Sequence, residues 1–452
     1  MSNANRHVVA IFGGACAGST AADILAAHDV EVVVFEQNVR PYGKIEDGLP
    51  RWHRDQRRME YKRIDGRLSR PGVHVVPRTR LGVDLQFADV VQWGWSAVLL
   101  ANGAWRDRPL DVPGADSWVD RGLVYQNPFI YWFNHAPESS YTGPRYEVPP
   151  GAICIGGGLA SIDVVKVFQL ELYGRALRDR GIEVSMHELE HAGIPAVCKT
   201  HGIADPHQLG VADSWLVYRR RVEDMPLAQA APDATPEQQA KIEFVRRKML
   251  AKAQEKYLFH MRPQALPVSL LIEEDHVAGV RFMETTSRGG RLVALEDHTF
   301  ELRSPLVVSA IGSLPEPIPG IVMKGTFYDY ADWDTGAYAP VAGVFGVGNV
   351  VTGRGNIKAS EHHSKDVANW LVEHYLGVHD ADEDRTVEGL FDQAASRGEA
   401  AATHVVAYLR DHPPLPAAQA EALIARVRGR QAAVGYQDYA SWMAAVTPAD
   451  AE

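Results

Sequence analysis

The sequence predicts an α/β protein with two doubly wound domains, the second inserted in the first, and a helical C-terminal tail. Two observations predict this class. Near the N-terminus, an apolar run at 8–12 leads into a glycine turn, a helix-compatible stretch at 18–27 and a second apolar run at 30–35. Another glycine turn follows the apolar run at 152–155 and continues as a helix-like segment. This order is typical of parallel sheets covered by helices, and its repetition indicates two such sheets.

Composition excludes several classes of function. The 452 residues are 46% hydrophobic, which is ample for two packed cores. The net charge of -11 argues against nucleic acid or an anionic membrane as the main partner. The cysteines Cys16, Cys154 and Cys198 form no Cys-x-x-Cys pair, which excludes a dithiol centre and a cysteine-ligated iron–sulfur cluster. With no signal peptide and no apolar run near the ~20 residues of a membrane span, we expect a soluble, cytoplasmic protein.

The first glycine turn, residues 13–18, has the spacing of a dinucleotide-binding turn. Gly13 permits the tight turn, and the small Ala15 lets a pyrophosphate approach the backbone, where the helix N-terminus offers free N–H groups. Gly18 completes the motif, although Ala15 replaces its middle glycine. Glu36 ends the next strand, where an acid accepts hydrogen bonds from ribose hydroxyls. A plain turn of an α/β sheet is the alternative, but the position of Glu36 favours dinucleotide binding.

The second glycine turn keeps Gly156 and Gly158 and has Ser161 where the helix packs closely. We interpret it as a second dinucleotide site, because Arg219 and Arg220 end a later strand. Guanidinium groups there bind a 2′-phosphate in bidentate fashion, which predicts NADPH rather than NADH.

Two alternatives stay open for these arginines. The run 219–221 can instead be a solvated strand end paired with Glu223 and Asp224. The long segment 181–213 contains Glu188 and Glu190, and either acid at the ribose would reverse the preference to NADH.

Further elements follow from apolar runs and the residues that end them. Strands are expected at 96–100, 214–218, 265–272, 276–284, 306–311 and 344–347, a surface loop near 227–237, and a helix around 364–375. From about residue 388 the tail is rich in Ala and Arg, with helices separated at 413–414. No metal site is expected, because His187 and His191, spaced as i and i+4, lack a third ligand nearby in sequence and fit a surface helix face.

Taken in order, five short segments resemble one family. They are 41–53, 101–103 with 113–114, 217–226, 310–312 and 346–357. The chain resembles the FAD-dependent pyridine-nucleotide reductases of the ferredoxin–NADP reductase (adrenodoxin-reductase-like) and glutamate synthase small-subunit group. The resemblance covers roughly residues 7–378. It implies domains at 1–114 (FAD, first part), 115–335 (nicotinamide nucleotide), 336–387 (FAD, second part) and 388–452 (helical extension).

The resemblance also implies residue roles. Gly43, Lys44 and Leu49 belong to the loop that wraps the flavin ring, and His53 at its end is expected at the flavin–nicotinamide junction, where it tunes hydride transfer. A histidine that packs under FAD or faces solvent is the alternative for His53. The remaining expected cofactor contacts are Ala101, Asn102 and Gly103 at the domain crossover, and Gly348, Asn349, Gly355 and Ile357 around the ribityl chain and flavin pyrimidine.

Three departures from the family are visible. Asn349 stands where the family has an aspartate, the cysteine-rich cluster domain of glutamate synthase small subunits is missing, and 181–213 is long. We expect hydride to pass from NADPH to flavin N5, and electrons to pass on to ferredoxin, flavodoxin or a partner subunit. The alternatives are a self-contained flavoenzyme that acts on a small organic substrate, and a flavin-binding scaffold without turnover.

Overall fold

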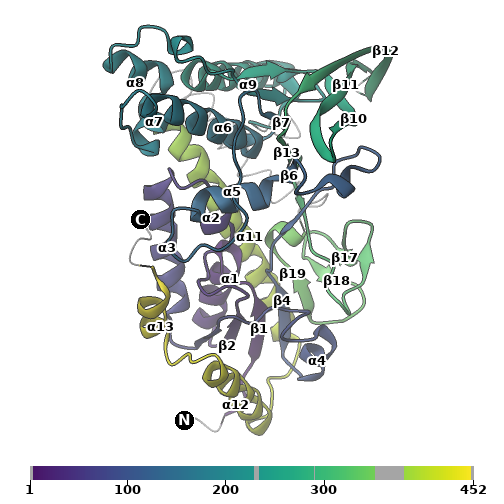
Figure 1. The fold of residues 1–452 in the computed structure, drawn as a ribbon. Coiled ribbons are helices and arrows are strands. Elements are labelled where there is room, and N and C mark those ends of the chain that lie inside the picture. Colours follow the sequence, from purple (N-terminus) through teal and green to yellow (C-terminus); the bar gives the residue numbers. More distant parts are fainter. Residues whose placement is uncertain (1–3, 229–233, 290, 352–380, 449–452) are drawn as a thin grey trace.

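The computed structural model describes residues 4–228, 234–289, 291–351 and 381–448. It confirms the predicted α/β class. Two mainly parallel sheets are covered by helices, and further helices follow at the C-terminus (Figure 1). The expected helix at 364–375, together with Gly355 and Ile357, lies outside the described residues. The domain boundaries stay a prediction.

The first sheet joins strands from distant parts of the chain. Its order is β17-β18-β19-β4-β1-β2-β3. The strands β1, β2, β3, β4 and β19 are parallel, and β17 and β18 form an antiparallel edge. Their bounds are β1 Val8–Phe12, β2 Glu31–Phe35, β3 Val73–Val76, β4 Ala97–Leu100, β17 Tyr330–Asp332, β18 Ala337–Tyr338 and β19 Val344–Gly346. β1 is buried along its whole length, as expected of a parallel strand covered on both faces.

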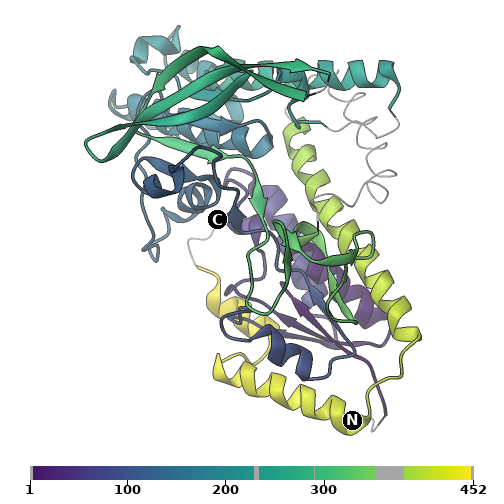
Figure 2. The ribbon, with the colours of Figure 1, turned by 90° about the vertical axis from the view of Figure 1, so that its right-hand side faces the viewer.

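Helices cover both faces of this sheet. One face packs against α1 (Cys16–Ala27), α3 (Arg54–Leu68), α11 (Ala381–Arg410) and α13 (Tyr439–Val446). The other face packs against α4 (Phe87–Gln92) and α12 (Ala417–Ala433). The predicted helical tail is therefore part of this domain, and Figure 2 shows α11 running along its side.

The second sheet, in the order β6-β13-β7-β8-β9, is parallel throughout. Its strands are β6 Leu123–Tyr125, β7 Ile153–Gly156, β8 Trp215–Val217, β9 His260–Arg262 and β13 Val307–Ala310. One face is covered by α5 (Gln126–His135), α6 (Leu159–Arg178), α7 (Met186–Ala192), α8 (Ile194–Thr200) and α9 (Pro236–Tyr257).

An antiparallel sheet covers the opposite face of the second sheet (Figure 2). It consists of β10 (Ala265–Glu273), β11 (His276–Arg288) and β12 (Arg291–Arg303). The first two strands follow the predicted apolar runs. The third was not predicted, because much of β12 is exposed and its charged residues do not alternate regularly with apolar ones.

Short strand pairs complete the fold. Pairing of β5 (Arg106–Asp107) with β14 (Ser313–Leu314) joins the two chain crossings between the sheets. β15 (Met323–Lys324) pairs with β16 (Phe327–Tyr328), and α2 (Lys44–Asp47) lies in the loop after β2. Within the described residues, no helix combines the length and apolar character that a membrane span requires.

Candidate functional site

Four segments leave the first sheet at the same edge. Phe12 of β1 is in register with Phe35 of β2 and Leu100 of β4, and Leu100 is in register with Gly346 of β19. The chain segments that follow these strands therefore meet at the carboxyl edge, where doubly wound sheets bind ligands. A cavity of about 570 Å³ lies there. Its wall contains the predicted residues Gly13, Ala15, Gly18, Glu36, Gly43, Lys44, Leu49, Ala101, Asn102, Gly103 and Gly348.

The glycine turn is packed too closely for side chains. Gly13 has φ +106°, and a Cβ on it would lie 2.4 Å from the carbonyl oxygen of Ala101. A Cβ on Gly18 would lie 1.9 Å from the carbonyl oxygen of Gly13. Both glycines are therefore required for α1 to begin directly against the turn.

Ala15 replaces the motif's middle glycine, and a second glycine accommodates it. A Cβ on Gly43 would lie 3.0 Å from the Ala15 methyl carbon, and Gly43 has φ +52°. Ala15 is the N-cap of α1 and provides no side-chain hydrogen bond, so the first-turn N–H groups lack an intrahelical acceptor and line the cavity wall. Such a helix terminus binds phosphate groups.

Glu36 lies at the end of β2 as predicted, 4% exposed. Its Oε2 accepts a hydrogen bond from the Gly14 N–H at 2.8 Å, and its Oε1 accepts one from the Asn38 N–H at 2.9 Å. Burial raises the pKa of Glu36 to about 7, against the lowering effect of these N–H groups. Each oxygen retains a second lone pair for a ribose hydroxyl.

Lys44 connects this cavity to the second domain. Its Nζ donates hydrogen bonds to Asn127 Oδ1 at 3.1 Å and to Ser313 Oγ at 3.0 Å. Burial lowers the pKa of Lys44 to about 8, against the raising effect of Asp107. Asn127 begins α5 and donates a further hydrogen bond to the Trp105 carbonyl oxygen at 3.0 Å. These hydrogen bonds hold the loop that was expected to wrap the flavin to both segments in which the chain passes from one sheet to the other.

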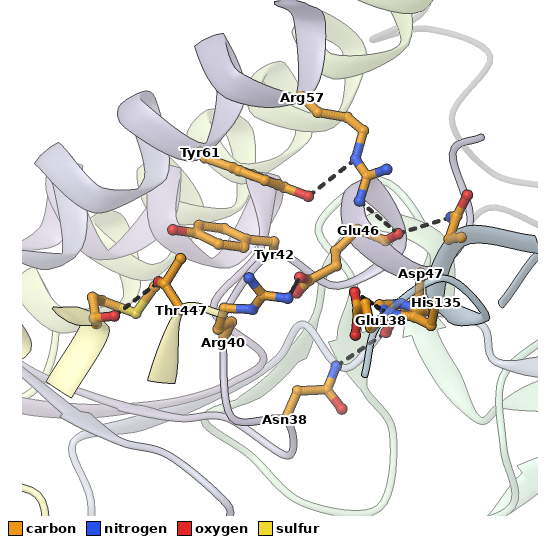
Figure 3. A network of polar contacts seen from close by, with 12 residues as sticks. Asn38, Arg40, Tyr42, Glu46, Asp47, Arg57, Tyr61, His135, Glu138 and Thr447 are labelled. Atoms are coloured by element: carbon orange, nitrogen blue, oxygen red, sulfur yellow. Dashed lines mark hydrogen bonds and ion pairs between the residues drawn. The ribbon is translucent and has the colours of Figure 1, made fainter. Parts of the chain in front are cut away.

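The rest of α2 is held by a polar network (Figure 3). Glu46 forms an ion pair with Arg40, and its carbonyl oxygen accepts a hydrogen bond from Arg57 at 3.1 Å. His135 of α5 lies between Asp47, at 3.1 Å, and Glu138, at 2.8 Å. Although burial alone would lower it, the pKa of His135 is raised by these two carboxylates. Both ends of α2 therefore contact the second domain.

His53 is buried at the N-cap of α3, 4% exposed, so it does not face solvent. It is not part of the described wall of the first cavity. Its neighbour Trp52 inserts into the helical core of the second domain, with its ring 5.2 Å from that of Phe133 and the Lys166 ammonium 4.7 Å from its ring centre. His53 therefore lies at the boundary between the two domains, and its role stays a prediction.

The second glycine turn follows β7 at the carboxyl edge of the second sheet. A Cβ on Gly156 would lie 2.5 Å from the Ala310 carbonyl oxygen, whereas a Cβ on Gly158, the N-cap of α6, would make an ordinary contact with Pro226 at 3.9 Å. Ser161, where the motif has glycine, is buried, and its hydroxyl donates a hydrogen bond to the Gly158 carbonyl oxygen at 2.6 Å. The serine therefore stabilises the turn that glycine usually permits.

Arg219 and Arg220 leave the same edge, because Ile155 of β7 is in register with Val217 of β8. Hydrogen bonds from Thr285 Oγ1 and the Gln264 N–H to the Arg219 and Arg220 carbonyl oxygens fix their backbone. Neither guanidinium forms an ion pair within the described part of the chain.

Among the described residues, the pairing expected of a solvated strand end is seen for the third arginine. Arg221 forms an ion pair with Asp224 at 2.9 Å, whereas Glu223 pairs with Arg247 of α9 at 3.0 Å. Arg219 is exposed and Arg220 half-buried, and their expected contact with a 2′-phosphate stays a prediction.

Glu188 and Glu190, the acids of segment 181–213 that were considered for the ribose, lie on α7 and not at the end of a strand. Glu190 is buried and accepts hydrogen bonds from Lys166 Nζ at 2.9 Å and the Tyr257 hydroxyl at 2.8 Å. Although burial opposes it, the charge of Lys166 lowers the pKa of Glu190. Glu188 lies in the first turn of α7, on which His187 and His191 are exposed as expected. Glu190 therefore serves packing of α6, α7 and α9.

One wall of the first cavity was not predicted. Phe391, Gln393, Ala394 and Arg397 of α11 line it. No motif marks them, and only the helical spacing of three to four residues places them on one face.

These features fit FAD at the first edge. The glycines leave backbone exposed beside a helix N-terminus, and the carboxyl of Glu36 lines the same cavity. Asn102 supplies a buried Oδ1 that has no hydrogen-bond partner among the described residues. The side chain of Asn349 is outside the described residues, so its expected ribityl contact stays a prediction. The second edge fits a nicotinamide nucleotide, with arginines in place of an acid.

No protein-family model matches the chain. It is 25% identical over 421 residues to the glutamate synthase [NADPH] small chain of Mycobacterium tuberculosis, which covers 91% of this chain and 68% of that one. It is 26% identical over 166 residues to the mitochondrial NADPH:adrenodoxin oxidoreductase of Arabidopsis thaliana, covering 36% and 32%. The structure of Mycobacterium tuberculosis FprA in complex with NADPH superposes with a TM-score of 0.59 at 20% identity, covering 87% of this chain and 90% of that one.

The fold is that of a two-domain, Rossmann-like oxidoreductase with a glycine turn at the carboxyl edge of each parallel sheet. The relatives above support an FAD/NADPH oxidoreductase that is similar to the adrenodoxin-reductase-like group. The resemblance inferred from five short motifs is confirmed.

The first prediction concerns Glu36. Because burial raises the pKa of this carboxyl to about 7, it is protonated below that pH in the FAD-free protein. The ionised form accepts stronger hydrogen bonds, so FAD affinity should rise as pH increases from about 6 to about 8. Glu36→Gln should remove this dependence and weaken FAD binding roughly tenfold at pH 8, as measured by flavin fluorescence.

Glu31→Gln is the matched control, because Glu31 lies at the opposite end of β2 and pairs with Arg6 and His74. It should leave FAD binding unchanged. A pH dependence that persists in Glu36→Gln would assign the titration to another group.

Proposed function

We propose that the chain binds FAD at the edge of the first sheet and NADPH at the edge of the second, and passes electrons through the flavin to a protein acceptor. Ferredoxin, flavodoxin or a partner subunit is the expected acceptor, and the cytoplasm is the expected location. FAD supplies the ability to accept hydride from a reduced nicotinamide and to release electrons singly or in pairs. The observation that carries the proposal is the presence of two glycine turns at the carboxyl edges of two sheets in one chain.

This chain's residues bind, orient and separate the two nucleotides. The first-turn N–H groups of α1 and Glu36 hold the flavin nucleotide, and Arg219 and Arg220 hold the 2′-phosphate. Lys44 and the pairing of β5 with β14 fix the flavin loop against the crossing between domains. These contacts support a fixed distance and orientation between the two nucleotide-binding edges, which hydride transfer requires.

The names of the relatives support a protein acceptor: one is an NADPH:adrenodoxin oxidoreductase and another an NADPH-Fe(3+) oxidoreductase subunit beta. For the alternative, a small organic substrate in the cleft, segment 181–213 is the candidate cover. None of its residues lines the two described cavities. Electron transfer to a protein is therefore the preferred function.

Anaerobic mixing of the yellow holoprotein with NADPH tests the proposal. Flavin absorbance should bleach within a single turnover, and cytochrome reduction should require added ferredoxin and depend on ionic strength. Protein that is colourless and cannot be reconstituted with FAD would refute the flavin site. Bound FAD that NADPH does not reduce would instead indicate a scaffold without turnover.

The second prediction concerns nucleotide preference. Replacing Arg219 and Arg220 together with Ala should raise the KM for NADPH by roughly tenfold or more, because charge-assisted hydrogen bonds to the 2′-phosphate are lost. The KM for NADH should change little. Arg221→Ala is the control, because Arg221 already pairs with Asp224 and should affect neither nucleotide. Equal losses for both nucleotides would show a structural role.

The third prediction concerns His53 as a positioning residue. Because it lies buried at the domain boundary beside Trp52, its charge state should alter the field at the flavin without direct proton transfer. His53→Ala should slow flavin reduction by NADPH and change its pH profile across roughly pH 5.5–8.5, with FAD content unchanged. The exposed His28, at the end of α1, provides the control His28→Ala.

Two results would contradict this role. An unchanged rate and pH profile in His53→Ala would remove His53 from the reaction. Loss of FAD would show that the imidazole only supports the cofactor.

A further inference from the structure

The long helix α11 supplies a wall of the FAD cavity from a part of the chain where no nucleotide motif occurs. Phe391, Ala394 and Arg397 are spaced by three residues and line the cavity together. Successive residues at this spacing lie on one face of a helix. Arg397 is the cation on this face, and it also lines the neighbouring cavity of about 470 Å³.

The residue after Arg397 fixes where this cation lies. Gly398 packs directly against the first turn of α1, since a Cβ on Gly398 would lie 2.2 Å from the Ala17 carbonyl oxygen. A Cβ on Gly348, beyond β19, would lie 3.4 Å from the Ala17 Cβ. α11 and the end of β19 therefore both contact the N-terminus of α1, and Arg397 enters the cavity beside that terminus.

Two positive features thus meet at one place. The N-terminus of α1 carries a partial positive charge and unpaired N–H groups, and the guanidinium of Arg397 adds a full charge. Burial lowers the pKa of this guanidinium, so its charged form is costly in this position. Guanidinium groups bind phosphate oxygens in bidentate fashion, which matches a pyrophosphate.

We propose that Arg397 binds the pyrophosphate of FAD and completes, from the C-terminal helix, the phosphate site that the glycine turn begins. The inference rests on the proposed function, because it requires FAD at this edge. It assigns Arg397 to the phosphates rather than to the flavin ring, because the ring-side loop has its own cation, Lys44, held by Asn127 and Ser313.

The test compares FAD release from purified holoproteins by the recovery of free flavin fluorescence. Arg397→Gln should raise the dissociation constant for FAD roughly tenfold or more, through loss of charge-assisted hydrogen bonds. Arg397→Lys, which keeps the charge but loses the planar fork, should weaken binding by a smaller factor. Arg410→Gln is the matched control, because Arg410 is exposed at the end of the same helix and should bind FAD like the wild type.

The absorption spectrum and reduction potential of the bound flavin separate this role from others. Both should match the wild type in each variant, because the pyrophosphate is remote from the ring. An unchanged FAD dissociation constant in Arg397→Gln, or a shifted potential, would overturn the inference. If Arg397→Gln does not fold, Arg397→Lys decides: affinity equal to the wild type would overturn it. Wild-type protein that binds no FAD would refute the proposed function itself, which keeps the two failures distinct.

Discussion

The carboxyl edge of the first sheet depends on one steric constraint. The turn after β1 packs so closely against the end of β4 and the start of α1 that no side chain fits there. Gly13 and Gly18 bring three backbone segments closer than any Cβ permits. That closeness leaves the first-turn N–H groups of α1 on the cavity wall. It also allows Ala101 to follow β4 directly beside the turn. The position of Glu36 relative to that contact is set by the register of β1 and β2.

The two domains are held together by polar groups that are mostly buried. Lys44 and His135 contact the opposite domain at the two ends of α2, and Trp52 enters the core of the second domain. Removing one partner of such a pair leaves the other group buried without a hydrogen bond, which costs more than the pair contributes in place. The arrangement therefore favours a single relative orientation of the domains.

Local pattern was sufficient to predict the parts of the site that lie within a few residues of a motif. The glycine turns, Glu36 and the arginines after β8 could be predicted because their chemistry depends on position relative to a strand end. Lys44 could be placed in the flavin loop, but its partners Asn127 and Ser313 are 83 and 269 residues away along the chain. The pairing of Glu190 with Lys166 likewise depends on how α7 packs on α6. The wall formed by α11 follows a helical spacing that any amphipathic helix shares.

The order in which strands enter the two sheets has a consequence for biosynthesis. The second sheet is complete once β13 has been made, at Ala310. The first sheet requires β19, and its cofactor wall requires α11, which ends at Arg410, about 100 residues later. At translation rates of about 5–20 residues per second, the domain that begins the chain waits roughly 5–20 s longer for its last element. The last strand of the second sheet is therefore made before the last strand of the first, and the wall of the cofactor cavity is complete only after α11 has been made.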